Sequence, residues 1–184
     1  MLFPNIFNET RRMKLKGEEK RFWWHFCQIK DSKDIPQKVP VVAGVDDLDY
    51  NDNYFAMLTD KVKIIHCIYL KETAVTDEGV KQISKVQQLK SLTLMKHPNI
   101  TKASLFYLNQ LTDLEYLDIW RTEIILEDLA ALDQLKNLKK VYVSSLAEVN
   151  GFFPELENEQ ILEHLIVLED LFPDCTFYVD HKEY

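Results

Sequence analysis

Residues 105–119 read LFYLNQLTDLEYLDI, and six of their side chains form an aliphatic ladder. The first five are spaced by three residues and the last by two. The same ladder occurs in residues 80–94, VKQISKVQQLKSLTL, and in residues 129–143, LAALDQLKNLKKVYV. Position 80 corresponds to position 105, and position 105 to position 129, and all eighteen ladder positions are aliphatic. The chain therefore contains an internal repeat of about 25 residues.

Each repeat contains two kinds of spacing. A spacing of three is typical of a helix or 3₁₀ turn that packs one stripe inward, whereas the closing spacing of two is typical of a short strand. Thr76 or Asp77, and Thr101, stand where they would cap the helical segments. A strand and a helix in about 25 residues make one coil of a solenoid, so the sequence predicts an α/β fold with parallel strands.

A weaker copy of the strand precedes the ladder. The residues 25 positions before Leu89, Leu92 and Leu94 are Ile64, Cys67 and Tyr69, in the stretch IIHCIYLK. We therefore expect these three side chains to point into the core of a first strand.

The stretches 89–113 and 114–137 resemble leucine-rich repeats. The segment VTDEGVKQISKVQQLKSLTL, residues 75–94, is similar to the cysteine-containing or F-box-associated variety, because its TDEGV matches the TDxGL-type start of the helix. The resemblance covers about residues 62–180. It implies a solenoid of four to five coils, with parallel strands on the concave side and short helices on the convex side. The resemblance also implies a residue after each strand that ties successive coils together by hydrogen bonds. This position departs from the regular Asn or Cys of the family: we expect His97 or Asn99 to fill it in one repeat and Thr122 in the next.

The two ends are expected to cap the solenoid. Residues 171–179, LFPDCTFYV, resemble the terminal LPNC-type strand repeat, and a helix with inward Ile161, Leu165 and Leu168 precedes them. We expect residues 1–61 to form an N-terminal capping segment and residues 62–184 to form the repeat domain. The insertion loop 144–160 holds Phe152 and Phe153, which are expected either in the cap core or as an exposed contact.

Within residues 1–61, one aromatic group and one acidic group need an interpretation. We expect the aromatic side chains to be buried against the first coil; they are Phe22, Trp23, Trp24 and Phe26. The stretch VPVVAGVDDLDY, residues 39–50, predicts a strand that runs into an acidic turn. The acids lack the glycine and the spacing of a calcium-binding loop, so we expect a solvated turn or an acidic rim rather than a metal site; they are Asp46, Asp47, Asp49 and Asp52.

Charge and composition limit the function. The net charge is -8, with a balance of +4 in residues 1–40 (nine Lys/Arg, five Asp/Glu) and -12 in residues 41–184 (thirteen against twenty-five). An acidic body argues against nucleic acid and favours a basic protein partner.

Three widely spaced cysteines predict reduced thiols in a cytoplasmic protein. No run approaches the about 18 apolar residues of a membrane span. We find no motif for a metal, a cofactor or a catalytic group, so we expect a non-enzyme.

The outward side chains of the strands are the candidate site. The expected columns are His66, Ser91, Tyr116 and Lys140; Ile68, Thr93, Asp118 and Tyr142, joined by Tyr178; and Leu70, Met95, Trp120 and Ser144. Tyr, Trp and Met are enriched in the cores of protein interfaces. We therefore expect a protein-binding module that acts through its concave face, such as an inhibitor or immunity-type protein. One alternative is a scaffold or assembly factor for respiratory or ATP-synthase complexes; in another, the N-terminal segment or the 144–160 loop covers the face.

Overall fold

The computed structural model describes residues 14–184, so residues 1–13 of the expected N-terminal cap lie outside the described part. The chain divides into two compact units, one that ends at Pro36 and one that covers Gln37–Tyr184. The described part of the first unit holds helix α1 (Gly17–Cys27) and the 3₁₀ turn η1 (Ser32–Asp34). The boundary at Pro36 assigns the rest of the expected capping segment to the second unit.

The aromatic side chains of α1 divide between the two sides of the helix. Trp23 is fully buried and packs edge-on against Phe22, with ring centroids 5.0 Å apart. Trp24 is 43% exposed, with the Lys30 ammonium 5.1 Å from its ring centroid. The prediction that Trp24 is buried is therefore wrong, because α1 buries Phe22 and Trp23 and turns the Trp24 ring outward.

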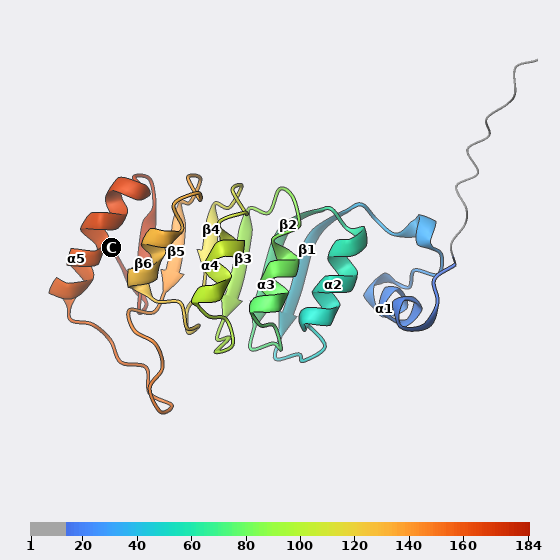
Figure 1. Ribbon diagram of the computed structural model, residues 1–184, viewed down its shortest axis with the longest axis horizontal. Helices are drawn as coiled ribbons and strands as arrows, with labels where there is room; N and C mark the ends of the chain where they lie inside the picture. Colours follow the sequence, from blue (N-terminus) through green and yellow to red (C-terminus); the bar gives the residue numbers. More distant parts are fainter. Residues whose placement is uncertain (1–13) are drawn as a thin grey trace, which may run out of the picture. The chain divides into compact units, whose positions relative to one another are not determined.

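The second unit is built on one seven-stranded sheet (Figure 1). Its strands are β1 (Lys38–Val45), β2 (Ile64–Lys71), β3 (Ser91–Met95), β4 (Tyr116–Asp118), β5 (Lys140–Val143), β6 (Thr176–Val179) and β7 (Lys182–Glu183). The strands lie side by side in sequence order, and every neighbouring pair is parallel except β6 and β7. The α/β class and the parallel strands are therefore confirmed, and residues 38–45 form the strand predicted in the N-terminal segment.

The helical segments between the strands lie on one side of this sheet (Figure 1). They are α2 (Asp52–Lys61), α3 (Asp77–Ile83), η2 (Lys102–Ser104), α4 (Leu105–Leu108), η3 (Leu126–Ala131) and α5 (Asn158–Leu171). Thr76 and Thr101 are the N-caps of α3 and η2, and each hydroxyl accepts a backbone N–H two residues on. The predicted capping positions are confirmed. In the described chain, no helix is both long and apolar enough for a transmembrane span.

The aliphatic ladder forms the core between the sheet and the helices. Seventeen of its eighteen positions are buried, and Leu105 is half-buried. Each strand turns its ladder residues toward the helices because successive side chains alternate between the two faces. The sequence repeat therefore predicts the core correctly from Val80 to Val143.

Strand β2, the first strand of the predicted repeat, departs from the prediction by one position. Ile65, Ile68 and Leu70 are fully buried, whereas Tyr69 is 38% exposed. The cause is the register, because Ser91 pairs with Cys67, whereas the repeat offset would pair it with the residue before. A slip of one residue exchanges the two faces of a strand, so the expectation that Ile64, Cys67 and Tyr69 point inward is wrong.

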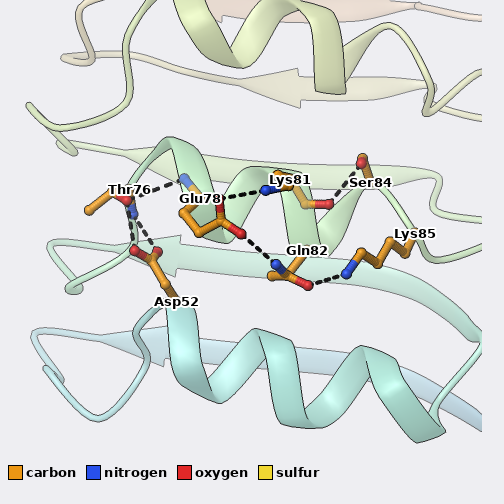
Figure 2. Close-up of polar contacts among 7 residues, drawn as sticks. All are labelled: Asp52, Thr76, Glu78, Lys81, Gln82, Ser84 and Lys85. Carbon is orange, nitrogen blue, oxygen red and sulfur yellow. Dashed lines mark hydrogen bonds and ion pairs between the residues drawn. The ribbon is translucent and has the colours of Figure 1, made fainter.

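Aspartates at the starts of two helices tie successive strand–helix pairs together. The Asp52 carboxylate accepts the Thr76 backbone N–H at 2.9 Å and the Thr76 hydroxyl at 2.7 Å (Figure 2). Asp77 holds Thr101 in the same way, one strand–helix pair later, at 2.8 and 2.7 Å. Asp52 therefore has a structural role beyond the expected solvated turn.

His97 also links one strand–helix pair to the preceding one. Its side chain is 1% exposed, and its Nε2 accepts the Thr73 backbone N–H at 3.2 Å and lies 2.8 Å from the Thr73 hydroxyl. Burial lowers the pKa of His97. Of the two residues proposed from the sequence for this position, His97 makes the link to the preceding pair and Asn99 is exposed.

The C-terminal part ends the sheet largely as predicted. Helix α5 buries Ile161, Leu165 and Leu168, and Phe177 and Val179 of β6 are also buried. Cys175, expected inward, is half-buried. The connection from β5 to α5 contains a tight hairpin, in which Asn150 and Gly151 have positive φ angles of 53° and 81° between the paired residues Val149 and Phe152. Phe152 is 68% exposed, which contradicts a place in the cap core.

Candidate partner-binding face

The side of the sheet opposite the helices carries three columns of side chains, and we call this surface the open face. The columns are Cys67, Ser91, Tyr116, Lys140 and Thr176; Tyr69, Thr93, Asp118, Tyr142 and Tyr178; and Lys71 and Met95, with Trp120 following two residues after Asp118. They come from β2 to β6, so five adjacent strands position them. At β1 the face continues with Val41 and Val45, which are 54% and 48% exposed.

The structure places seven of the eight predicted site residues on the open face. They are Tyr116, Asp118, Trp120, Met95, Tyr142, Lys140 and Tyr178. His66 is not among them. Because of the one-residue shift in β2, Cys67 takes the place expected for His66, and the His66 Nδ1 lies 3.0 Å from the Gln88 carbonyl oxygen. Ile68 and Leu70, also expected outward, are buried in the core.

Three tyrosine rings form a continuous stack across β4, β5 and β6. Tyr142 lies parallel to Tyr178 with ring centroids 4.3 Å apart and an interplanar angle of 5°. The centroids of Tyr116 and Tyr142 are 5.5 Å apart. All three rings are half-buried. The three rings therefore form a partly apolar platform on the open face.

Charged groups border this tyrosine stack. The Tyr178 hydroxyl donates to the Glu183 carboxylate at 2.7 Å, and this bond raises the pKa of Tyr178 to about 12. The Lys140 ammonium lies 5.8 Å from the Tyr178 ring centroid. Both partners are exposed, so the stack meets solvent beside one cation and one anion.

Asp118 lies in the middle of the open face. Its side chain is only 4% exposed and accepts the Trp120 backbone N–H at 3.1 Å. Burial raises the pKa of Asp118 to about 6, although the Trp120 N–H and the charge of His181 oppose the shift. Burial likewise raises the pKa of Tyr116 to about 12, and the negative charge of Asp118 adds to it. The sequence predicts the position of Asp118 but not its burial.

Trp120 is held at the edge of the face by residues that the sequence does not single out. Its ring centroid lies 4.2 Å from that of His181, and the Arg121 guanidinium lies 4.2 Å from it. Arg121 is also 4.2 Å from the ring of Phe153, which comes from the 144–160 loop. The loop therefore reaches the margin of the open face. The contacts with His181 and Phe153 join side chains far apart in the sequence, so only the fold reveals them.

The described residues offer little that resembles a catalytic or metal centre. They contain no group of three His, Cys, Asp or Glu side chains placed to hold a metal ion. A cavity of about 160 Å³ lies between the loops at 86–89 and 110–113. Asp113 is the one ionisable residue that lines it, so the cavity offers no acid–base pair.

Comparison with known proteins does not assign this chain to a family. No model of a known protein family matches the sequence, and no curated protein matches it at a significant level.

Proposed function

We propose that this chain is a small leucine-rich-repeat solenoid that binds another protein and has no enzymatic activity. Three features support the architecture: the nearly constant offset between paired strands from β1 to β5, the helices on one side of the sheet, and the ties made by Asp52 and Asp77. In this proposal the open face is the concave surface of the solenoid, residues 62–184 contain the coils of the repeat domain, and β1 with α2 belongs to the capping segment.

The observation that carries the binding proposal is the stacked, half-exposed tyrosine platform of Tyr116, Tyr142 and Tyr178. Tyr and Trp dominate the energetic centres of protein interfaces because they bury a large area at low entropic cost. The core of the sheet is complete without these rings, because the ladder residues fill its other face. A binding role gives a physical reason for placing them there.

The partner is proposed to be basic. Asp118 lies beside Tyr142 in the same column of the open face, with its pKa raised by burial. An arginine or lysine of the partner would stabilise its carboxylate. Residues 41–184 carry a net charge of -12 (thirteen Lys/Arg against twenty-five Asp/Glu), which would steer a basic protein toward the face. An inhibitor or immunity-type protein of the cytoplasm, which neutralises a basic protein, is the form of the proposal that fits this charge.

Affinity purification from the native host, followed by mass spectrometry, tests the proposal. The wild type is compared with Trp120→Ala and Tyr142→Ala on the open face and with Phe106→Ala, a residue on α4 that is 72% exposed. We expect a basic protein that both open-face variants lose and the Phe106 variant retains. Equal recovery by all of them would contradict binding at this face, and recovery of respiratory or ATP-synthase subunits would favour the assembly-factor alternative.

A further inference from the structure

Helix α5 carries a second apolar surface, away from the open face. Its buried stripe is Ile161, Leu165 and Leu168, as the last helix on the sheet requires. On another side of the same helix, Leu162 is 51% exposed and Ile166 is 66% exposed. They are four residues apart, so they lie one above the other on the helix surface.

Four exposed carboxylates surround this apolar pair. Of the five other exposed helical positions three or four residues away from Leu162 or Ile166, four are acidic and one is the uncharged Asn158; the acids are Glu159, Glu163, Glu169 and Asp170. None of the four forms an ion pair within the described chain. Residues 144–184 contain ten acids and one basic residue other than His, Lys182. The surface therefore combines an apolar centre with an uncompensated acidic rim.

We infer that this surface of α5 docks a basic amphipathic helix of a protein partner. Leucine-like side chains spaced by three or four residues would cover Leu162 and Ile166, as in other helix-to-helix contacts. Lysines or arginines beside them would pair with the four carboxylates. This site is independent of the open face, because its residues belong to α5 and contribute to none of the three columns.

Charge excludes the two obvious other occupants. A second copy of the chain that met α5 with its own α5 would bring eight carboxylates together, four from each copy, and like charges in contact are repulsive. A membrane surface would present anionic headgroups to the same rim, whereas helices that lie on membranes carry Lys and Arg on the polar face. A basic helix satisfies both the apolar centre and the rim.

The test uses the full chain and a labelled amphipathic peptide of about 18 residues, with leucine at every third or fourth position and lysines beside the leucines. Fluorescence anisotropy measures its affinity for the wild type, for Leu162→Ser/Ile166→Ser, and for Glu163→Lys/Asp170→Lys. Val167→Ser is the matched control, because Val167 is 57% exposed on the same helix but is not three or four residues from Leu162 or Ile166. A peptide of the same composition with scrambled order controls for charge alone. Circular dichroism confirms that each variant is folded.

We expect both double variants to weaken peptide binding by about tenfold or more, and Val167→Ser to change it by less than about twofold. We also expect weaker binding of the scrambled peptide, and a loss of affinity between about 0.05 and about 0.5 M salt. Equal binding by the wild type and the Leu162→Ser/Ile166→Ser variant would overturn the inference. So would self-association, in sedimentation experiments on the free protein, that this variant abolishes.

Discussion

Replacing Asp118 by Asn should stabilise the protein, and the gain should depend on pH. Burial raises the pKa of Asp118 from 3.8 to about 6 in the folded state. The folded protein therefore favours the protonated form, and the carboxylate present at neutral pH opposes folding. A difference of about two pKa units corresponds to about 3 kcal/mol. Asn keeps an oxygen for the Trp120 N–H and removes the buried charge.

The sign sets the shape of the pH profile. Because the folded-state pKa is raised, the fold favours the protonated carboxyl. The wild type's unfolding free energy therefore holds its full contribution from Asp118 below about pH 3.8, and this contribution is lost as the pH rises through about 6. The variant has no such loss. The difference in unfolding free energy between Asp118→Asn and wild type should be small near pH 4, rise between pH 4 and 6, and level off at about 2 to 3 kcal/mol above pH 7.

Urea unfolding of both proteins across this range measures the difference directly. Asp113→Asn, which removes an exposed carboxylate in a loop, is the matched control and should give a flat difference. A flat profile for Asp118→Asn would refute the reasoning, because it would mean that the carboxylate is as well solvated in the fold as in the unfolded chain. A gain in stability would also indicate that Asp118 is retained for a purpose other than folding.

Local geometry supports three further predictions. Gln88→Gly should stabilise the protein by up to about 1 kcal/mol in urea unfolding, because Gln88 has a φ of 60° and only glycine adopts this region without strain. Asp77→Ala should cost about 2 to 3 kcal/mol in the same assay, since it leaves the backbone N–H and the hydroxyl that the carboxylate holds without a partner. Glu78→Ala, which removes an exposed carboxylate paired with Lys81, should cost clearly less than Asp77→Ala. A thiol reagent should label exposed Cys27 quickly and Cys175 slowly, because burial raises the pKa of Cys175 to about 12; equal rates by mass spectrometry would contradict this.

The repeat predicts most of the fold because its signal is local. Every ladder side chain from Val80 to Val143 repeats at nearly constant spacing, and each strand–helix pair packs chiefly against its neighbours. The prediction of the inward side chains of β2 is wrong because its sequence, IIHCIYLK, has apolar side chains in both alternating sets. The repeat offset selects the wrong set, and only the pairing of Cys67 with Ser91 shows the right one.

The candidate site could be predicted only in outline. The alternation of β4 places Tyr116 and Asp118 on one face, Trp120 follows at the same spacing, and the register of β5 adds Tyr142. The burial of Asp118 and the contact of Arg121 with Phe153 depend on side chains distant in the sequence. No periodic pattern carries such information, because these contacts arise from loops that follow the strands.

The most direct test of a protein-binding open face is a comparison of two single substitutions against the purified partner. Calorimetry would measure the affinity of wild type, Tyr142→Ala and Phe106→Ala, which remove one aromatic ring from opposite sides of the sheet. The account predicts that Tyr142→Ala weakens binding by about tenfold or more, while Phe106→Ala changes it by less than about twofold. Unchanged affinity for Tyr142→Ala, or a larger loss for Phe106→Ala, would contradict it.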